Sequence, residues 1–185
     1  MSIETLKDRL PDYAKDIKLN LGSLVTEDTL SPQQKWGCLV ATAHACGNKD
    51  VIGAVYADAA SHLSPAAFQA AQASAGIMAM NNIYYRFVHL ARNPSYHTLQ
   101  AKLRMNVIGN PGVEKGDFEL WSLAVSAVNG CGMCIDTHEQ HLVQAGFSAD
   151  QIQTAVRIAA VIYAASRILD AEGAAQAVGA RTAVA

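Results

Sequence analysis

Apolar residues recur at intervals of three and four positions along most of this chain. That spacing places side chains on one face of a helix. No segment shows the sustained alternation of apolar and polar residues that is typical of a half-buried strand. The pattern therefore predicts an all-α fold. Two segments show the helical spacing most clearly, one with Trp36, Leu39, Val40 and Ala43 and one with Ala67, Phe68, Ala71 and Ala75.

Three serines mark the expected starts of helices. Ser31 and Ser64 each precede a proline, which puts a capping hydroxyl before the residue type that suits the first helical position. Ser148 precedes another helical stretch, without a proline. The run 109–116 is rich in glycine and proline, which interrupt helices, so we expect the main internal boundary there.

The chain contains two copies of one short pattern. Trp36 is followed ten residues later by Cys46 and a glycine, and the same step separates Trp121 from Cys131, 85 positions further on. Tryptophan and Cys-Gly are uncommon enough for this match to indicate an internal duplication of a helical unit. We predict a single domain over residues 1–185, with a degenerate repeat over about 31–86 and an active repeat over about 116–170.

The two copies differ where chemistry is expected. The second copy holds two cysteines, a histidine and a glutamate that the first copy does not match as a set. A purely architectural role would more easily have left this set in both copies, so we expect the second copy to carry the chemistry. The second-copy residues Glu119, Cys131, Cys134 and His138 align with Gln34, Cys46, Lys49 and Gly53 of the first.

The amino-acid composition indicates which kinds of partner and which cellular compartment to expect. Apolar residues make up 51% of the 185 residues and charged residues only 16%, which favours burial between subunits as well as within one. The net charge of −2 and the pI of about 6.3 indicate neither a nucleic acid nor an anionic membrane as a partner. The N-terminus has no signal-peptide pattern, and the longest apolar stretch, 158–165, is too short to cross a membrane. We therefore expect a cytoplasmic protein.

The close cysteine pair is the main candidate for chemistry, because a reducing compartment disfavours a structural disulfide framework. His138 follows Cys134 by four positions, so on a helix both face one side, where an imidazole can take the thiol proton or stabilise the thiolate. Cys131 can then attack an oxidised Cys134 and close a disulfide. Glu119, on the preceding helix, can reach across to His138 and pass protons.

Other interpretations of the cysteine pair stay open at this level. A structural zinc site needs four ligands, and the remaining cysteines and histidines form no second pair with the usual spacing. Plain core packing is the third interpretation, and Cys38 and Cys46 are expected to be small buried hydrophobes. A thioredoxin fold is rejected because both flanks of the pair are helical. A structural role is expected for the histidines without a partner pattern, which are His44, His62, His89, His97 and His141.

The chain resembles the alkyl hydroperoxide reductase D (AhpD) family, of the carboxymuconolactone decarboxylase-like superfamily. The family signature, Glu followed by Cys-x-x-Cys-x-x-x-His, falls on Glu119, Cys131, Cys134 and His138. The similarity runs through nearly the whole chain. It includes Met1-Ser-Ile-Glu4, Tyr13-Ala-Lys-Asp-Ile-Lys-Leu-Asn-Leu21, Met80-Asn-Asn82, Leu103-Arg-Met-Asn106, Asn110-Pro-Gly112, Phe118-Glu-Leu-Trp121 and Ala127-Val-Asn-Gly-Cys131.

The resemblance implies an all-helical fold with an internal duplication, a homotrimer and a role in antioxidant defence. It implies reduction of the disulfide of a partner peroxiredoxin, AhpC, and weak direct peroxidase activity on alkyl hydroperoxides. No cofactor or metal is expected to be bound. Electrons are expected from dihydrolipoamide on a lipoylated 2-oxoacid dehydrogenase component, and ultimately from NADH through dihydrolipoamide dehydrogenase.

The resemblance also implies a role for each residue of the signature. Cys134 would be the more exposed nucleophile, passing through a sulfenic acid or a mixed disulfide. Cys131 would be the deeper resolving thiol and proton donor, and His138 and Glu119 would form a proton relay. Some members have a histidine where this chain has Met133, and methionine cannot relay a proton. Proton transfer here is therefore expected to depend on His138, Glu119 and water.

Two other functions compete with this one. A lactone decarboxylase, or another carboxymuconolactone-type activity, is the runner-up enzyme, but it leaves the cysteine pair without a role. A metal-binding or redox-sensing interaction module is the non-enzymatic alternative. It predicts either stoichiometric zinc or a disulfide that changes assembly without turnover.

Overall fold

A computed structural model describes residues 1–182, with side chains through residue 179, and every regular element in that part of the chain is helical. The predicted all-α class is therefore confirmed. The elements are α1 (Ile3–Lys7), η1 (Asp12–Ala14, a 3-10 turn), α2 (Lys15–Thr26), α3 (Pro32–Cys46), α4 (Lys49–Ala59), α5 (Pro65–Leu90), η2 (Pro94–His97, a 3-10 turn), α6 (Asn106–Gly109), α7 (Lys115–Asn129), α8 (Gly132–Gln144) and α9 (Ala149–Thr182).

The predicted helix starts are confirmed by their caps. The Ser31 hydroxyl accepts a hydrogen bond from the Gln34 backbone N–H at 3.2 Å, and the Gln34 side chain accepts one from the Ser31 N–H at 3.1 Å. The hydroxyls of Ser64 and Ser148 cap α5 and α9 in the same way. These bonds satisfy backbone donors that have no partner within the first turn of a helix.

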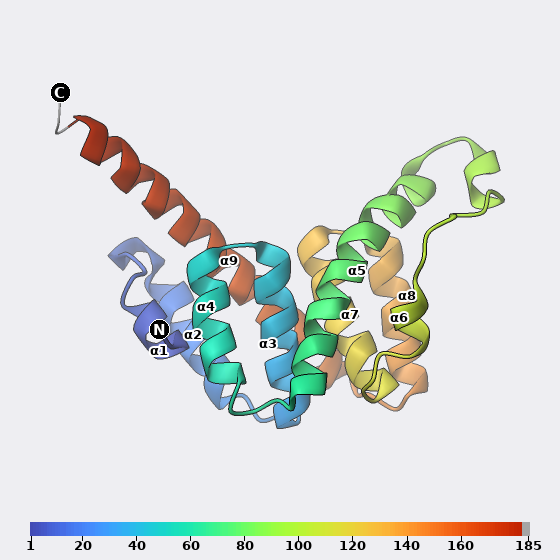
Figure 1. Ribbon diagram of the computed structural model, residues 1–185, viewed down its shortest axis with the longest axis horizontal. Helices are drawn as coiled ribbons and strands as arrows, with labels where there is room; N and C mark the ends of the chain where they lie inside the picture. Colours follow the sequence, from blue (N-terminus) through green and yellow to red (C-terminus); the bar gives the residue numbers. More distant parts are fainter. Residues whose placement is uncertain (183–185) are drawn as a thin grey trace.

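Helices α3 and α7 lie side by side in the middle of the fold, with α5 and α9 against both (Figure 1). Trp121, on α7, is completely buried and lies directly over Gly37 on α3. A methyl group at Gly37 would sit 2.1 Å from the indole, so only glycine allows this approach. The indole Nε1–H donates to the Gln34 carbonyl oxygen at 3.2 Å. The two central helices are thus joined by one tightly fitted aromatic contact.

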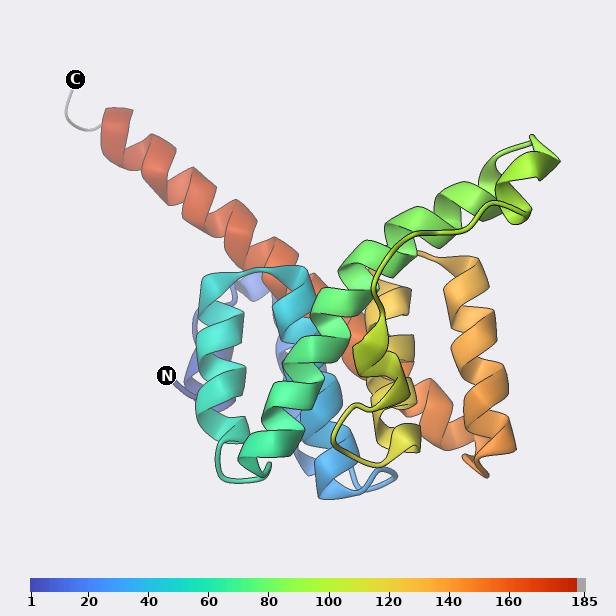
Figure 2. The same cartoon turned by 45° about the vertical axis from the view of Figure 1, so that its right-hand side comes forward.

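Two helices extend beyond this body. The C-terminal parts of α5 and α9 project from it in diverging directions (Figures 1 and 2). The projecting part of α5 exposes large apolar side chains, which are Ile83, Phe87 and Leu90. Helix α9 is long and apolar enough to cross a membrane by length and composition, but 56% of the 18-residue apolar stretch that meets this criterion is buried inside the fold. Its apolar character is thus largely accounted for by the core.

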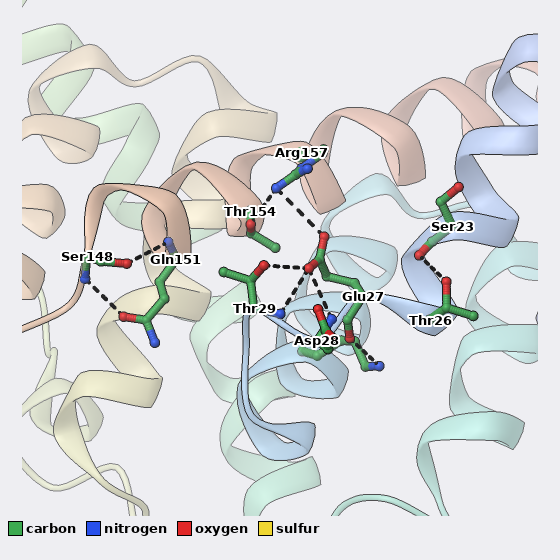
Figure 3. A network of polar contacts seen from close by, with 10 residues as sticks. Ser23, Thr26, Glu27, Asp28, Thr29, Ser148, Gln151, Thr154 and Arg157 are labelled. Carbon is green, nitrogen blue, oxygen red and sulfur yellow. Dashed lines mark hydrogen bonds and ion pairs between the residues drawn. The ribbon is translucent and has the colours of Figure 1, made fainter.

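The connection between α2 and α3 is fastened to α9 by Glu27 (Figure 3). One carboxylate oxygen accepts hydrogen bonds from the backbone N–H and the hydroxyl of Thr29, at 3.0 and 2.7 Å. The other lies 3.7 Å from the guanidinium of Arg157, which also donates to the Thr154 hydroxyl. The hydrogen bonds from Thr29, and to a lesser extent the positive charge of Arg157, keep the pKa of Glu27 below its ordinary value.

Helices α7, α8 and α9 follow the same order along the chain as α3, α4 and α5. Lys115 and Gly132 begin α7 and α8, each 83 residues after the start of α3 or α4, and Ala149 begins α9, 84 residues after the start of α5. This spacing agrees with a duplication. The repeat boundaries at about 31–86 and 116–170 stay a prediction.

Candidate dithiol active site

The turn between α7 and α8 positions the cysteine pair. Gly130 ends α7 in the left-handed conformation, with φ of 67°, which is costly for residues with a side chain. The Cys131 N–H then donates to the Ser126 carbonyl oxygen at 3.1 Å. Cys131 therefore stands at the N-cap of α8, and Cys134 lies in the first turn, where the helix dipole favours a thiolate.

The two cysteines of this turn form a disulfide, with their Cα atoms 5.3 Å apart. Cys131 is completely buried, whereas 7% of Cys134 is exposed. In this oxidised form the sulfurs cannot act as thiolate ligands of a zinc ion. Cys38 and Cys46 are free and buried, as expected, and burial raises the pKa of both thiols. The disulfide thus lies at the turn between α7 and α8, and the two free thiols lie on α3.

Glu119 and His138 meet beside this disulfide. Nδ1 of His138, on α8, lies 2.6 Å from Oε2 of Glu119, on α7, and both side chains are almost fully buried. As a neutral imidazole, His138 can keep Nδ1–H on the carboxylate and leave Nε2 free to accept a proton. As an imidazolium it can also donate from Nε2 to the Met78 sulfur, 3.3 Å away. The pair can therefore take up and return a proton.

A second histidine shares the same carboxylate oxygen. Nδ1 of His141 lies 3.3 Å from Oε2 of Glu119, and about half of the His141 side chain is exposed. Burial alone would raise the pKa of Glu119, but hydrogen bonds and charge from His138, and then from His141, outweigh burial and lower it. The structural role expected for His141 did not foresee this contact with the candidate site. The missed signal was its place seven residues after Cys134, on the same face of α8.

A cavity of about 290 Å³ opens beside Cys134 and has a mainly apolar wall. The sequence did not single out most of its lining. A larger hollow of about 840 Å³ lies between α1 and α2, away from the dithiol. We assign the smaller cavity to the candidate site because Glu119, Cys134 and His138 line it. It is lined by Met78, Asn81, Tyr85, Met105, Ile108, Glu119, Met133, Cys134, Thr137, His138 and His141.

Two adjacent asparagines on α5 support the site in different ways. Asn81 is 5% exposed, lines the cavity, and its side-chain oxygen has no hydrogen-bond partner among the described residues. Asn82 is fully paired in the core: its Nδ2 donates to the Ser126 hydroxyl, and its Oδ1 accepts from Asn129, both at 2.9 Å. Asn82 thereby connects α5 to the end of α7, just before Cys131.

Glu119, His138 and His141 are also placed so that together they can bind a cation. One ligand atom each from Glu119, His138 and His141 lies within 4.8 Å of the other two. Imidazole nitrogen and carboxylate oxygen are ligands that zinc accepts. Both histidines, however, already contact the carboxylate directly, His138 by a hydrogen bond and His141 at 3.3 Å, so Glu119 can hold a proton on either imidazole without a metal.

Comparison with known proteins matches both the segment that holds this site and almost the whole chain. Residues 94–177 match the Carboxymuconolactone decarboxylase family. The alkyl hydroperoxide reductase AhpD of Rhodopseudomonas palustris (strain BisA53) is 61% identical over 180 residues, covering 97% of this chain and 99% of that protein. The AhpD of Rhodospirillum centenum is 59% identical over the full length of both chains, and that of Azorhizobium caulinodans is 63% identical over 94% of this chain and 96% of its own.

Proposed function

Because the chain belongs to the alkyl hydroperoxide reductase AhpD family, we propose that it is an antioxidant thiol–disulfide oxidoreductase that serves a peroxiredoxin. Its partner would be the disulfide form of AhpC, and its reductant would be dihydrolipoamide. The observation that carries this proposal is the Cys131–Cys134 disulfide beside the buried Glu119–His138 pair. A dithiol with its own acid–base pair can exchange disulfides without a bound cofactor or metal.

The first step is attack by Cys134. His138 takes the Cys134 proton, and the thiolate forms a mixed disulfide with one sulfur of the peroxiredoxin disulfide, releasing the other sulfur as a thiolate. Cys131 then attacks Cys134 and releases the second peroxiredoxin sulfur. The two thiol protons of the enzyme end on the two peroxiredoxin thiols, and two electrons leave the enzyme as its disulfide closes. Glu119 holds the imidazolium while it carries the proton.

Direct reduction of a hydroperoxide uses the same sulfurs. Cys134 attacks the terminal peroxide oxygen, the O–O bond breaks, and the alkoxide takes a proton from His138 to leave as an alcohol. Cys131 then displaces water from the sulfenic acid on Cys134 and closes the disulfide. Cys131 supplies the last proton, in keeping with its role as the resolving thiol.

Dihydrolipoamide suits the cavity beside Cys134. Its dithiol can attack Cys134 and then close on itself as lipoamide, which returns both enzyme sulfurs to thiols. Its aliphatic chain fits an apolar wall that includes Met78, Met105 and Ile108. The unpartnered oxygen of Asn81 is available to accept a hydrogen bond from a polar group on the bound molecule.

The same proposal includes the remaining partners and the assembly. A lipoylated 2-oxoacid dehydrogenase component would present the dithiol, and dihydrolipoamide dehydrogenase would renew it from NADH in the cytoplasm. A homotrimer would give a partner surface to the exposed apolar side chains of α5, which are Ile83, Phe87 and Leu90.

A coupled assay tests this function. NADH oxidation is followed with dihydrolipoamide dehydrogenase, lipoamide, the peroxiredoxin and an alkyl hydroperoxide, and the peroxiredoxin is then omitted. We expect hydroperoxide-dependent turnover that is largest with the peroxiredoxin and disappears in Cys134→Ser. Cys46→Ser is the matched control and should keep full activity, because Cys46 is buried in the first copy. Full activity of Cys134→Ser, or no turnover of the natural chain, would reject the proposed electron path.

A further inference from the structure

We infer that His141 is the solvent-facing end of the proton relay, exchanging with bulk water the proton that Glu119 and His138 carry for Cys134. The inference rests on the proposed roles of Glu119 and His138. It starts from the position of one oxygen atom, Oε2 of Glu119. This oxygen lies 2.6 Å from Nδ1 of His138 and 3.3 Å from Nδ1 of His141.

The helix geometry accounts for this shared contact. His138 and His141 are three residues apart on α8, so their side chains are neighbours on one face of that helix. Glu119, on the adjacent helix α7, reaches between them with one oxygen. Both imidazoles can then donate a hydrogen bond to the same carboxylate, and a proton gained by one changes the charge that the other feels.

The exposed fraction of the side chain increases from Glu119 to His138 to His141. The side chain of Glu119 is 5% exposed, that of His138 is 11% exposed, and that of His141 is 48% exposed. The two buried groups therefore have little direct access to water. His141 touches the carboxylate on one side and solvent on the other, which is the position that a proton exchanger needs.

The other groups around the site are poorly suited to exchanging a proton with solvent. Nε2 of His138 faces the Met78 thioether, which accepts a hydrogen bond weakly and carries no proton. From α5, Tyr85 also lines the cavity, but its hydroxyl donates to the Met105 sulfur, 3.8 Å away. Histidine is the side-chain type that ordinarily changes charge between about pH 5 and 8. His141 is thus the wall residue with the right chemistry and the right exposure.

In the proposed reaction, His141 can exchange a proton with water at two stages. Cys134 must lose its proton to become the attacking thiolate, and a proton must later reach the alkoxide that leaves the hydroperoxide. Between these events the proton can rest on the relay or pass through His141 to water and be replaced from it. The overall reaction, two thiols and a hydroperoxide giving a disulfide, an alcohol and water, is unchanged.

The test separates proton exchange from a structural role by using His141→Gln. Glutamine keeps an N–H that can face Glu119 but cannot carry a proton at neutral pH. The reduced protein is mixed with tert-butyl hydroperoxide in single-turnover experiments between about pH 5 and 8, and disulfide formation is timed at low and high buffer concentration. A chelator is present throughout, because these three side chains can also hold a cation.

We expect His141→Gln to be about tenfold slower or more in dilute buffer, and to recover as imidazole buffer is added. The natural chain and His89→Gln, a change on an exposed part of α5, should not depend on buffer concentration. A rate equal to that of the natural chain would overturn the inference, as would a slow rate that imidazole does not restore in a folded protein. His138→Phe is measured in parallel: an unchanged rate there would instead reject the proposed relay.

Discussion

Nδ1 of His138 lies 2.6 Å from Oε2 of Glu119, so two residues nineteen positions apart in sequence form a nearly dry hydrogen-bonded pair between α7 and α8. Because the partners lie on different helices, this pair joins the helix that precedes the dithiol to the helix that carries it. We expect it to contribute to stability and, in the proposed mechanism, to proton transfer, and both contributions can be measured.

The stability contribution of Glu119 should depend on pH. The pKa of Glu119 is lowered in the folded protein from its ordinary value of 4.5, so the carboxylate stabilises the fold above that pH and loses this effect as the pH falls through the lowered value. Urea unfolding of the natural chain and of Glu119→Gln should differ most near neutral pH. The difference should shrink below about pH 4.5. A difference that stays constant into acid would show that Glu119 is not ionised in the fold.

Replacing His138 by phenylalanine should slow activation of the dithiol. Without the imidazole, Cys134 loses the group placed to accept its proton, so more alkaline solution is needed to form the thiolate. Alkylation of the reduced protein by iodoacetamide, followed by mass spectrometry of Cys134, should shift to higher pH. The Cys46→Ser background removes one competing thiol. An unchanged pH profile would exclude His138 as the group that activates this thiol.

The contact between α3 and α7 should not tolerate a side chain at Gly37. A methyl group there would lie 2.1 Å from the Trp121 indole, so Gly37→Ala should lower the free energy of unfolding by about 1–3 kcal/mol through overpacking. Gly53→Ala is the matched control, because its Cβ meets nothing within 4 Å in the middle of α4. It should instead stabilise the protein by about 0.5–1 kcal/mol. Equal effects of the two changes would show that the helices can separate at no cost.

Asn82 should be needed to support the turn before Cys131. Asn82→Ala removes two buried hydrogen bonds, leaving the Ser126 hydroxyl and the Asn129 amide without these partners. We expect a loss of about 1–3 kcal/mol in the free energy of unfolding, measured in urea. Asn20→Ala, on the exposed face of α2, is the control and should be nearly neutral. A neutral Asn82→Ala would mean that water or a small shift replaces both bonds.

The sequence by itself determined the features that lie within one helix or one turn. The helical class, the starts at Ser31, Ser64 and Ser148, and the placing of Cys134 and His138 on one face of α8 all follow from local geometry. Backbone hydrogen bonding fixes the rise and rotation between neighbouring residues of a helix. Spacing along the chain therefore becomes spacing in the molecule without reference to the rest of the fold.

Only the tertiary structure decided which helix faces meet. The second contact of Glu119, with His141, and the closeness of Met78 to His138 join residues from different helices. Such contacts depend on how far each helix is rotated and how closely it approaches its neighbour. Close packing of the whole core sets both, as where Gly37 lets α3 approach Trp121. That information is distributed over many residues of the core, and no single motif of this chain contains it.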